Sequence, residues 1–186
     1  MEKKILDLGC GSQKLTRKKC FPNYDFRGKV IGLDINKNEE TDIICDLNKG
    51  KIPFKNNEFD IVYTSHCLEH LDNITKILSE IHRILKPGGY FLVRVPHISY
   101  INSLGDLSHK RLFGYSSFDY LFLKYHEQLK NEPLFKLIKR RTIFGKFYKN
   151  IGIEFLANKF PTLYNNFFTG IFQAREMHWE LRKLIE

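Results

Sequence analysis

The sequence predicts a doubly wound α/β domain, in which a mostly parallel β-sheet is covered on both faces. Short β-branched apolar runs recur through the first half of the chain with little period-two alternation, as in strands that are buried on both faces. A glycine-containing turn follows the first run, and a long amphipathic segment precedes the last one. The 186 residues are enough for one domain with a sizeable core.

The expected strands of this half occupy residues 4–9, 29–35, 42–47, 60–65 and 90–96. Only six residues lie between the second and third strands, so we expect a plain loop there and not a helix. The clearest helix covers residues 72–86, and Pro87-Gly88-Gly89 ends it. Its apolar residues recur at helical spacing and are interpreted as core: Ile74, Ile77, Leu78, Ile81, Ile84 and Leu85.

The second half of the chain is less regular. Residues 97–133 are polar and aromatic without a clean period, and we interpret them as a cap inserted after the fifth strand. Residues 134–144 and 172–184 are expected to form an antiparallel pair of strands at one edge of the sheet. Between them, residues 147–171 form an insertion rich in Phe, Tyr and Asn, for which we expect short helices packed against the cap.

The composition excludes several classes of protein. Hydrophobic residues make up 42% of the chain and aromatic residues 14%, which is incompatible with a disordered protein. No apolar run approaches the roughly 18 residues of a membrane span, so we expect a cytoplasmic protein. The cysteines form no Cys-x-x-Cys pair, so neither a disulfide framework nor a zinc knuckle is expected from Cys10, Cys20, Cys45 and Cys67.

The formal charge of +9 is partly concentrated in two basic clusters that lie far apart in the sequence. A phosphorylated or nucleotide-linked substrate would suit such clusters, and the solvated surface of a lysine-rich protein explains them equally well. The first cluster comprises Lys14, Arg17, Lys18 and Lys19, and the second comprises Lys136, Lys139, Arg140, Arg141, Lys146 and Lys149.

The turn Asp7-Leu8-Gly9-Cys10-Gly11 follows the first strand. Its glycines let the backbone approach a ligand without a Cβ clash, so the turn can hold a nucleotide-like molecule. Alone the pattern is weak, because Gly-x-Gly also occurs in ordinary turns. Asp34 ends the second strand, where its carboxylate can accept hydrogen bonds from both ribose hydroxyls or can cap a turn. A dinucleotide-dependent dehydrogenase would share these two features.

Five segments then follow one another in a specific order: ILDLGCG at residues 5–11, IGLD at 31–34, CDL at 45–47, FDIVYTSHCLEHL at 59–71 and ILKPGGYF at 84–91. This order resembles the class I S-adenosylmethionine-dependent methyltransferases over about residues 4 to 96, and the last two segments argue against a dehydrogenase. The resemblance implies a Rossmann-like seven-stranded sheet whose last strand is antiparallel. It also implies that S-adenosylmethionine lies across the carboxyl ends of the first strands.

The resemblance further implies a role for individual residues. Asp34 would bind the ribose, and Asp46 with Leu47 would contact the adenine, while Gly9 and Gly11 would hold the methionine end. Gln13 departs from the family, since many relatives have a third glycine there, and few residues precede the first strand, where relatives often have a helix over the substrate. We therefore expect residues 97–133 to supply the lid. The full set expected to contact the cofactor is Asp7, Gly9, Cys10, Gly11, Asp34, Ile35, Asp46, Leu47 and Ser65.

Methyl transfer to a hydroxyl requires removal of a proton, and a histidine with a near-neutral pKa is suited to that role. His66 and His97 follow the fourth and fifth strands, at the edge of the sheet where ligands bind in open α/β folds. Both are therefore candidate catalytic residues. The histidines not expected to react are His70, His82, His126 and His178.

Residues 96–99 (PHIS) followed by residues 105–113 (GDLSHKRLF) resemble a subgroup of these methyltransferases that is often associated with glycan or secondary-metabolite clusters. We expect Asp106 to orient a histidine, with His97 or His109 as the base. Arg111 and Ser99 are expected to bind the substrate. The alternative is a loop whose polar groups satisfy one another. His97, Asp106 and His109 would also suit a divalent cation, but such a set often arises by chance on a loop, so we expect no metal.

We therefore expect an S-adenosylmethionine-dependent enzyme, most consistent with O-methylation of a small polar acceptor in polysaccharide or metabolite biosynthesis. The acceptor would be a sugar, a nucleotide-linked sugar or a phosphorylated metabolite. One alternative is an RNA methyltransferase, but no RNA-binding module is visible and no Asn-Pro-Pro-Tyr-like signature follows the fourth strand. Another is a non-catalytic partner protein with residues 147–172 as its interface. We expect no nucleic-acid partner, and a homodimer remains open.

Overall fold

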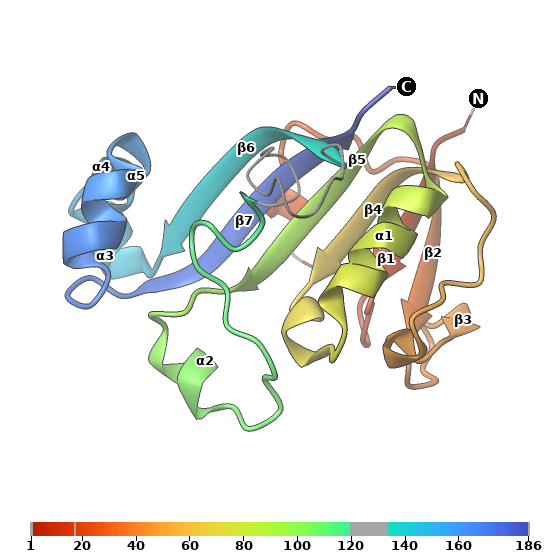
Figure 1. Cartoon of the computed structure of the whole chain (residues 1–186), viewed down its shortest axis with the longest axis horizontal. Coiled ribbons are helices and arrows are strands. Elements are labelled where there is room, and N and C mark those ends of the chain that lie inside the picture. The colour runs from red at the N-terminus through yellow and green to blue at the C-terminus, as the bar shows by residue number, and fades with distance from the viewer. Residues whose placement is uncertain (1, 17, 120–133, 186) are drawn as a thin grey trace, which may run out of the picture.

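Seven strands form one mixed sheet in the computed structural model, which describes residues 2–16, 18–119 and 134–185 (Figure 1). The strand order is β3-β2-β1-β4-β5-β7-β6, with β1 to β5 parallel and β7 antiparallel to both of its neighbours. This confirms the expected Rossmann-like fold with an antiparallel last strand. The bounds are β1 Lys4–Leu8, β2 Lys29–Asp34, β3 Ile43–Ile44, β4 Phe59–Ser65, β5 Leu85–Pro96, β6 Phe135–Phe144 and β7 Ala174–Lys183.

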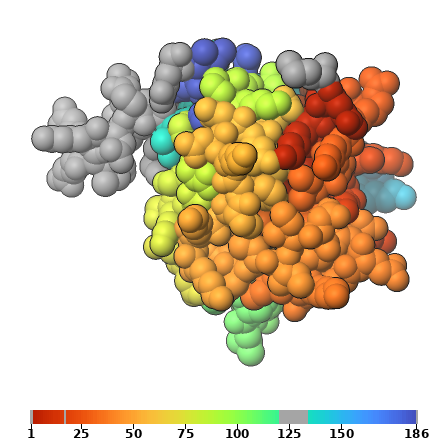
Figure 2. All heavy atoms as spheres, turned by 90° about the vertical axis from the view of Figure 1, so that its right-hand side faces the viewer, coloured from red at the N-terminus to blue at the C-terminus, as the bar shows by residue number. Residues whose placement is uncertain are grey.

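The third strand is shorter than the sequence predicted, with two residues in place of residues 42–47. Asp46 is the reason, because its side chain accepts a hydrogen bond from Asn48 N and starts the 3₁₀ helix η2 (Leu47–Lys49). The connection from Asp34 to Ile43 contains no helix, as expected from its length. Seen from this edge, the surface is formed by the N-terminal part of the chain, coloured orange (Figure 2).

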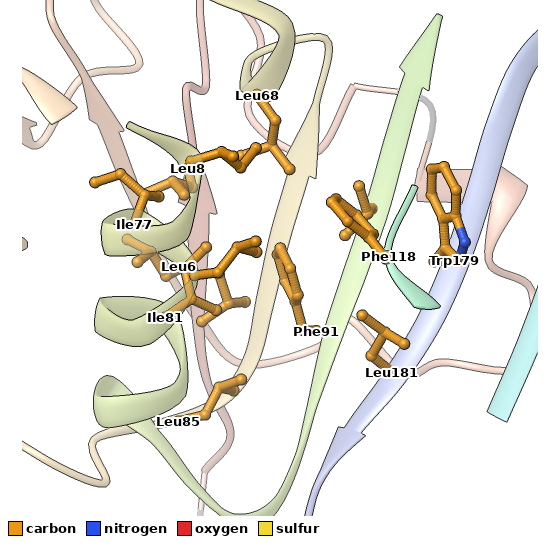
Figure 3. Packing of buried hydrophobic residues seen from close by; sticks show 14 of the residues in the cluster. Leu6, Leu8, Leu68, Ile77, Ile81, Leu85, Phe91, Phe118, Trp179 and Leu181 are labelled. Atoms are coloured by element: carbon orange, nitrogen blue, oxygen red, sulfur yellow. The ribbon is translucent and has the colours of Figure 1, made fainter. Parts of the chain in front are cut away.

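The long helix α1 (Ile74–Ile84) covers one face of the sheet. Asn73 caps its first turn by accepting a hydrogen bond from Lys76 N at 3.1 Å. The predicted stripe is buried, and Ile77 and Ile81 point at the β1 side chains (Figure 3). The helix ends before residue 86, because Leu85 already pairs with Phe59 at the start of β5.

Within the described ranges no long helix covers the opposite face, which differs from the usual doubly wound arrangement. The one helix among the described residues of the connection between β1 and β2 is the 3₁₀ helix η1 (Lys18–Cys20). Leu15 and Phe21 of this connection lie on either side of η1 and are buried against Ile5, Ile61 and Tyr63 of the sheet. This connection contains Pro, Asn and Gly and no apolar stripe at helical spacing, so it cannot form an amphipathic helix.

The segment expected to be a cap begins after β5 with the short helix α2 (Ile101–Gly105), which lies beyond the carboxyl end of that strand (Figure 1). Its later part joins the core, because the rings of Phe113 and Phe118 pack on Trp179 of β7. No residue of the described part, 97–119, lines the large cavity at the carboxyl ends of the strands. The remainder of the expected cap, 120–133, and His126 with it, lies outside the described residues.

The aromatic insertion forms short helices, as expected: α3 (Lys146–Asn150), α4 (Ile153–Lys159), α5 (Pro161–Leu163) and the π-helical turn η6 (Tyr164–Phe168). They pack mainly on the end of the β6–β7 pair, where Phe144 and Ala174 are buried with Ala157 and Tyr164. The sequence had placed them against the cap. None of the helices in the described ranges is long and apolar enough to cross a membrane.

Candidate active site

A cavity of about 580 Å³ opens at the carboxyl ends of β1, β2 and β4. Parallel strands place the residues that follow them at one edge of the sheet, so side chains far apart in the sequence meet there. The structure brings together at this cavity every residue that the sequence predicted for the cofactor: Asp7, Gly9, Cys10, Gly11, Asp34, Ile35, Asp46, Leu47 and Ser65.

The glycine turn is shaped by two residues with positive φ, Gly9 at +73° and Gly11 at +54°. The backbone amides of Gly9 and Cys10 both donate to Leu33 O, which fixes the turn against β2. A Cβ atom on Gly9 would lie 2.5 Å from Cys67 Sγ, so no side chain fits there. A Cβ on Gly11 would meet no protein atom within 4 Å, which leaves this backbone open to a ligand in the cavity.

Asp34 is held in place by two backbone amides. One carboxylate oxygen accepts from Gly11 N and the other from Asn36 N, each at 2.9 Å. Each oxygen keeps a further lone pair, so the carboxylate can still accept hydrogen bonds from two neighbouring hydroxyls. Beyond it, the exposed Ile35 and the buried Leu47 present apolar surface on which a flat ring can lie. These features fit the ribose and adenine of a nucleoside.

Asp7 lies at the base of the cavity and is only 2% exposed. Its carboxylate accepts a hydrogen bond from Leu15 N, which ties the glycine turn to the β1–β2 connection. Burial raises the pKa of Asp7 to about 7, because the hydrogen bond from Leu15 only partly offsets the loss of water around the charge.

His66 directly follows β4 and lines the same cavity. Its backbone has φ +53°, a conformation that is uncommon for residues other than glycine and that clusters at functional sites. Its ring lies between two carboxylates, with Nδ1 3.3 Å from Glu69 Oε1 and Nε2 3.6 Å from Glu176 Oε1. Partial burial disfavours the charged ring, but the contacts with Glu176 and Glu69 outweigh it and raise the pKa of His66 above its usual value.

Glu176, on β7, connects this histidine to a buried polar network. Arg94 of β5 donates to both of its carboxylate oxygens, at 2.7 Å from Nε and 2.5 Å from Nη2, and also donates to Ser65 Oγ at 2.7 Å. His178 Nε2 lies 2.9 Å from Glu176 Oε2. Burial favours the neutral carboxyl, but contacts with His178, His66 and Arg94 prevail and hold the pKa of Glu176 far below its usual range. Glu176 therefore stays anionic.

The other predicted catalytic residues lie away from the cavity. His97 is fully buried, its Nδ1 accepts from Ser99 N at 3.0 Å, and burial lowers its pKa to about 4. Ser99 in turn contacts Ala174 and not the cavity. Arg111 donates to the backbone oxygens of residues 71 and 72, where it fastens the loop to the start of α1.

The structure does bring Asp106 to His109, with Oδ2 3.5 Å from Nε2, but neither lines the cavity. Ligand atoms of Glu69, His70 and His109 lie within 4.8 Å of one another, the spacing of a metal site. His97 is not part of that group. Because His109 Nε2 faces the Asp106 carboxylate, we assign no metal to these residues.

Sequence reasoning missed Glu69, Arg94 and Glu176, which surround His66. One signal was available: Arg94 is a charged residue inside the apolar run that forms β5, and such a residue is buried only when it is paired. Its partner lies 82 residues away on β7, so the pair itself could not be identified from local sequence.

Comparison with known proteins agrees with this geometry. The sequence model of the family described as "Methyltransferase domain" matches residues 6–93. An uncharacterized methyltransferase of Schizosaccharomyces pombe is 38% identical over 106 residues, which are 47% of this chain and 37% of that protein. A demethylmenaquinone methyltransferase of Leptospira interrogans is 28% identical over 174 residues, covering 78% of this chain and 69% of that protein.

The fold is shared with solved structures. The crystal structure of an S-adenosylmethionine-dependent methyltransferase from Archaeoglobus fulgidus superposes with a TM-score of 0.66 at 18% identity, over 97% of this chain and 86% of that one. The chain spans little more than a third of the length of the Schizosaccharomyces pombe relative, so the match concerns the domain. Residues 6–93 thus match the methyltransferase domain, and the chain has the fold of an S-adenosylmethionine-dependent methyltransferase, which supports S-adenosylmethionine as the cofactor.

Proposed function

We propose that the protein O-methylates a small polar acceptor and that His66 is the general base. The position of His66 carries this proposal, because it is a histidine on the wall of the cofactor cavity with both ring nitrogens facing carboxylates. When bound, S-adenosylmethionine supplies an electrophilic methyl group, so the protein has to align the acceptor and remove its proton.

His66 is suited to accept that proton. A hydroxyl group is a weak nucleophile until its proton moves to a base, and the base works best with a pKa near the operating pH. Glu69 and Glu176 stabilise the imidazolium that forms, and Arg94 keeps Glu176 ionised. The left-handed backbone at His66 fixes the ring at the carboxyl end of β4. His97, neutral and enclosed, cannot reach a ligand in the cavity.

The names of relatives refer to acceptors as different as demethylmenaquinone and sterols, so they indicate no single acceptor class. The cavity wall offers hydrogen-bonding groups beside His66, among them Ser65, His70 and Arg94. Such a wall favours a hydroxylated acceptor such as a sugar, a nucleotide-linked sugar or a phosphorylated metabolite.

The test combines cofactor binding with methyl transfer. Wild type, His66→Gln and the matched variant His109→Gln are titrated with S-adenosylmethionine by calorimetry and then assayed with a panel of sugar phosphates and nucleotide sugars. All three should bind the cofactor with similar Kd. His66→Gln should lose about 10²- to 10⁴-fold in kcat, the typical contribution of a general base, and His109→Gln should keep the wild-type rate.

The pH profile gives a second readout. The wild-type rate should rise as His66 loses its proton, with a midpoint above the usual histidine pKa of about 6.5. Glu176→Gln removes one of the contacts that favour the imidazolium, so it should move this midpoint to lower pH. A wild-type rate in His66→Gln would disprove its role as base, and a wild-type protein that binds no S-adenosylmethionine would disprove the proposed function.

A further inference from the structure

The two basic clusters of the sequence meet around one cavity. This second cavity has a volume of about 820 Å³ and lies on the face of the sheet opposite α1. Gln13 and Thr16 line both it and the cofactor cavity, so the two adjoin. Cations from three parts of the chain surround it: Lys14, Lys18 and Lys19 from the β1–β2 connection, Arg141 from β6 and Lys149 from α3.

Some of these cations are already paired and others are not. Lys14 Nζ lies 2.7 Å from Asp42 Oδ2, and Arg141 Nη2 lies 3.4 Å from Glu180 Oε1. Lys18, Lys19 and Lys149 have no ion pair within the described ranges.

Two carboxylates also line the cavity. Glu40 lies near Lys14, at 4.0 Å, and Glu154 accepts a hydrogen bond from Phe144 N at 2.9 Å. They leave an excess of positive charge, which favours an anionic ligand.

A buried histidine adds a specific polar atom to the wall. His178 is 2% exposed and lines the cavity, and its Nδ1 has no hydrogen-bond partner among the described residues. Its other nitrogen, Nε2, lies 2.9 Å from Glu176, whose carboxylate also faces His66. A neutral ring that donates from Nε2 presents an accepting lone pair at Nδ1. A hydroxyl group of the ligand would satisfy that atom.

Resting on the proposed function, we propose that this cavity binds the phosphate of a hydroxylated, phosphate-bearing methyl acceptor. Lys18, Lys19 and Lys149 hold the phosphate, and the adjoining wall at Gln13 and Thr16 lets the rest of the acceptor enter the cofactor cavity. Among the residues that the structure describes, the lining contains no Phe, Tyr or Trp on which a base could stack, which favours a small phosphate ester over RNA.

Calorimetry with inorganic pyrophosphate tests this proposal without any methyl transfer. The double variant Lys18→Ser/Lys19→Ser removes two charges at the cavity. The matched control Lys51→Ser/Lys55→Ser removes two exposed charges that line neither cavity. Pyrophosphate should bind wild type and control with equal Kd and should bind the Lys18/Lys19 variant at least ten-fold more weakly. S-adenosylmethionine should bind all three proteins equally.

Each other outcome has a definite meaning. Equal weakening in both double variants, or no binding of pyrophosphate to wild type while S-adenosylmethionine binds, would overturn the cavity assignment and leave the proposed function standing. Failure of wild type to bind S-adenosylmethionine would instead overturn the proposed function. If a single-stranded RNA binds wild type more tightly than pyrophosphate does, and the Lys18/Lys19 variant loses this RNA binding, the small-molecule assignment is overturned. Uridine diphosphate is titrated as an additional ligand. If it binds the wild-type protein more tightly than pyrophosphate does, the acceptor is a nucleotide derivative. If the two bind equally, the acceptor is a simple phosphate ester.

Discussion

Replacing Asp7 with asparagine should remove a contribution to stability that is lost as pH rises toward 7. Asp7 is buried, and its pKa is raised from 3.8 to about 7 by that burial. Between these two values the folded state holds a proton that the unfolded state has released. The contribution of Asp7 to the stability of wild type therefore falls as pH rises from about 4 to about 7 and changes no further above that. Asp7→Asn has no such proton, so this loss should be absent.

The size of the effect follows from the pKa shift. One pKa unit corresponds to about 1.4 kcal/mol, so the shift of Asp7 costs wild type roughly 4 kcal/mol at pH 8 relative to pH 3. About 3 kcal/mol of this should fall between pH 5 and pH 8, because the cost grows over two units of that range. The asparagine side chain keeps an oxygen that can accept a hydrogen bond from Leu15 N. Its amide group does not titrate, so any change that it makes to the free energy of unfolding is the same at every pH.

Urea unfolding, followed by circular dichroism at pH 5, 6, 7 and 8, measures this difference. The free energy of unfolding of Asp7→Asn, relative to wild type, should rise steadily across the series. Asp72→Asn, which removes an exposed carboxylate, controls for the general effect of losing an acidic group. A difference between wild type and Asp7→Asn that stays constant within about 1 kcal/mol from pH 5 to pH 8 would refute the reasoning.

Two further predictions concern the walls of the active site. Gly9→Ala should weaken S-adenosylmethionine binding at least ten-fold in calorimetry, because a Cβ would clash with Cys67 and the residue has φ +73°; an unchanged Kd would contradict the role assigned to the turn. Arg94→Met should lower the free energy of unfolding by roughly 3–5 kcal/mol, since it leaves the Glu176 carboxylate buried without its bidentate partner. The double variant Arg94→Met/Glu176→Gln should recover much of that loss, and an equally unstable double variant would argue against the pairing.

The meeting of the expected cofactor residues at one cavity could be predicted because their positions depend on local sequence. Gly9-Cys10-Gly11 directly follows β1 and Asp34 is the last residue of β2, so both lie at the carboxyl edge of the parallel sheet. Because the carboxyl ends of neighbouring parallel strands lie at the same edge of a sheet, these residues lie close together in the fold. All of them line one cavity in the structure.

The surroundings of the base could not be predicted in the same way. His97 also follows a strand, but the chain beyond it folds back, and Phe113 pairs with it in an isolated bridge that helps to enclose the ring. His66 owes its environment to Glu176 on β7, whose position beside β5 depends on the antiparallel register of the last strand. Sequence near a histidine does not show which distant strand will be its neighbour.

The sequence by itself determined most of the strands, the long helix and the strand-end turns, and the order of its motifs, through their resemblance to a known family, indicated the cofactor. Each of these depends on backbone preferences and apolar periodicity within about a dozen neighbouring residues. Only the tertiary structure decided which histidine faces the cavity and whether the two basic clusters join. Lys18 and Arg141 lie more than a hundred residues apart, and they line one cavity because β6 packs beside β7 and the β1–β2 connection covers that face of the sheet. Such contacts arise from the burial of the whole chain, which no local pattern specifies.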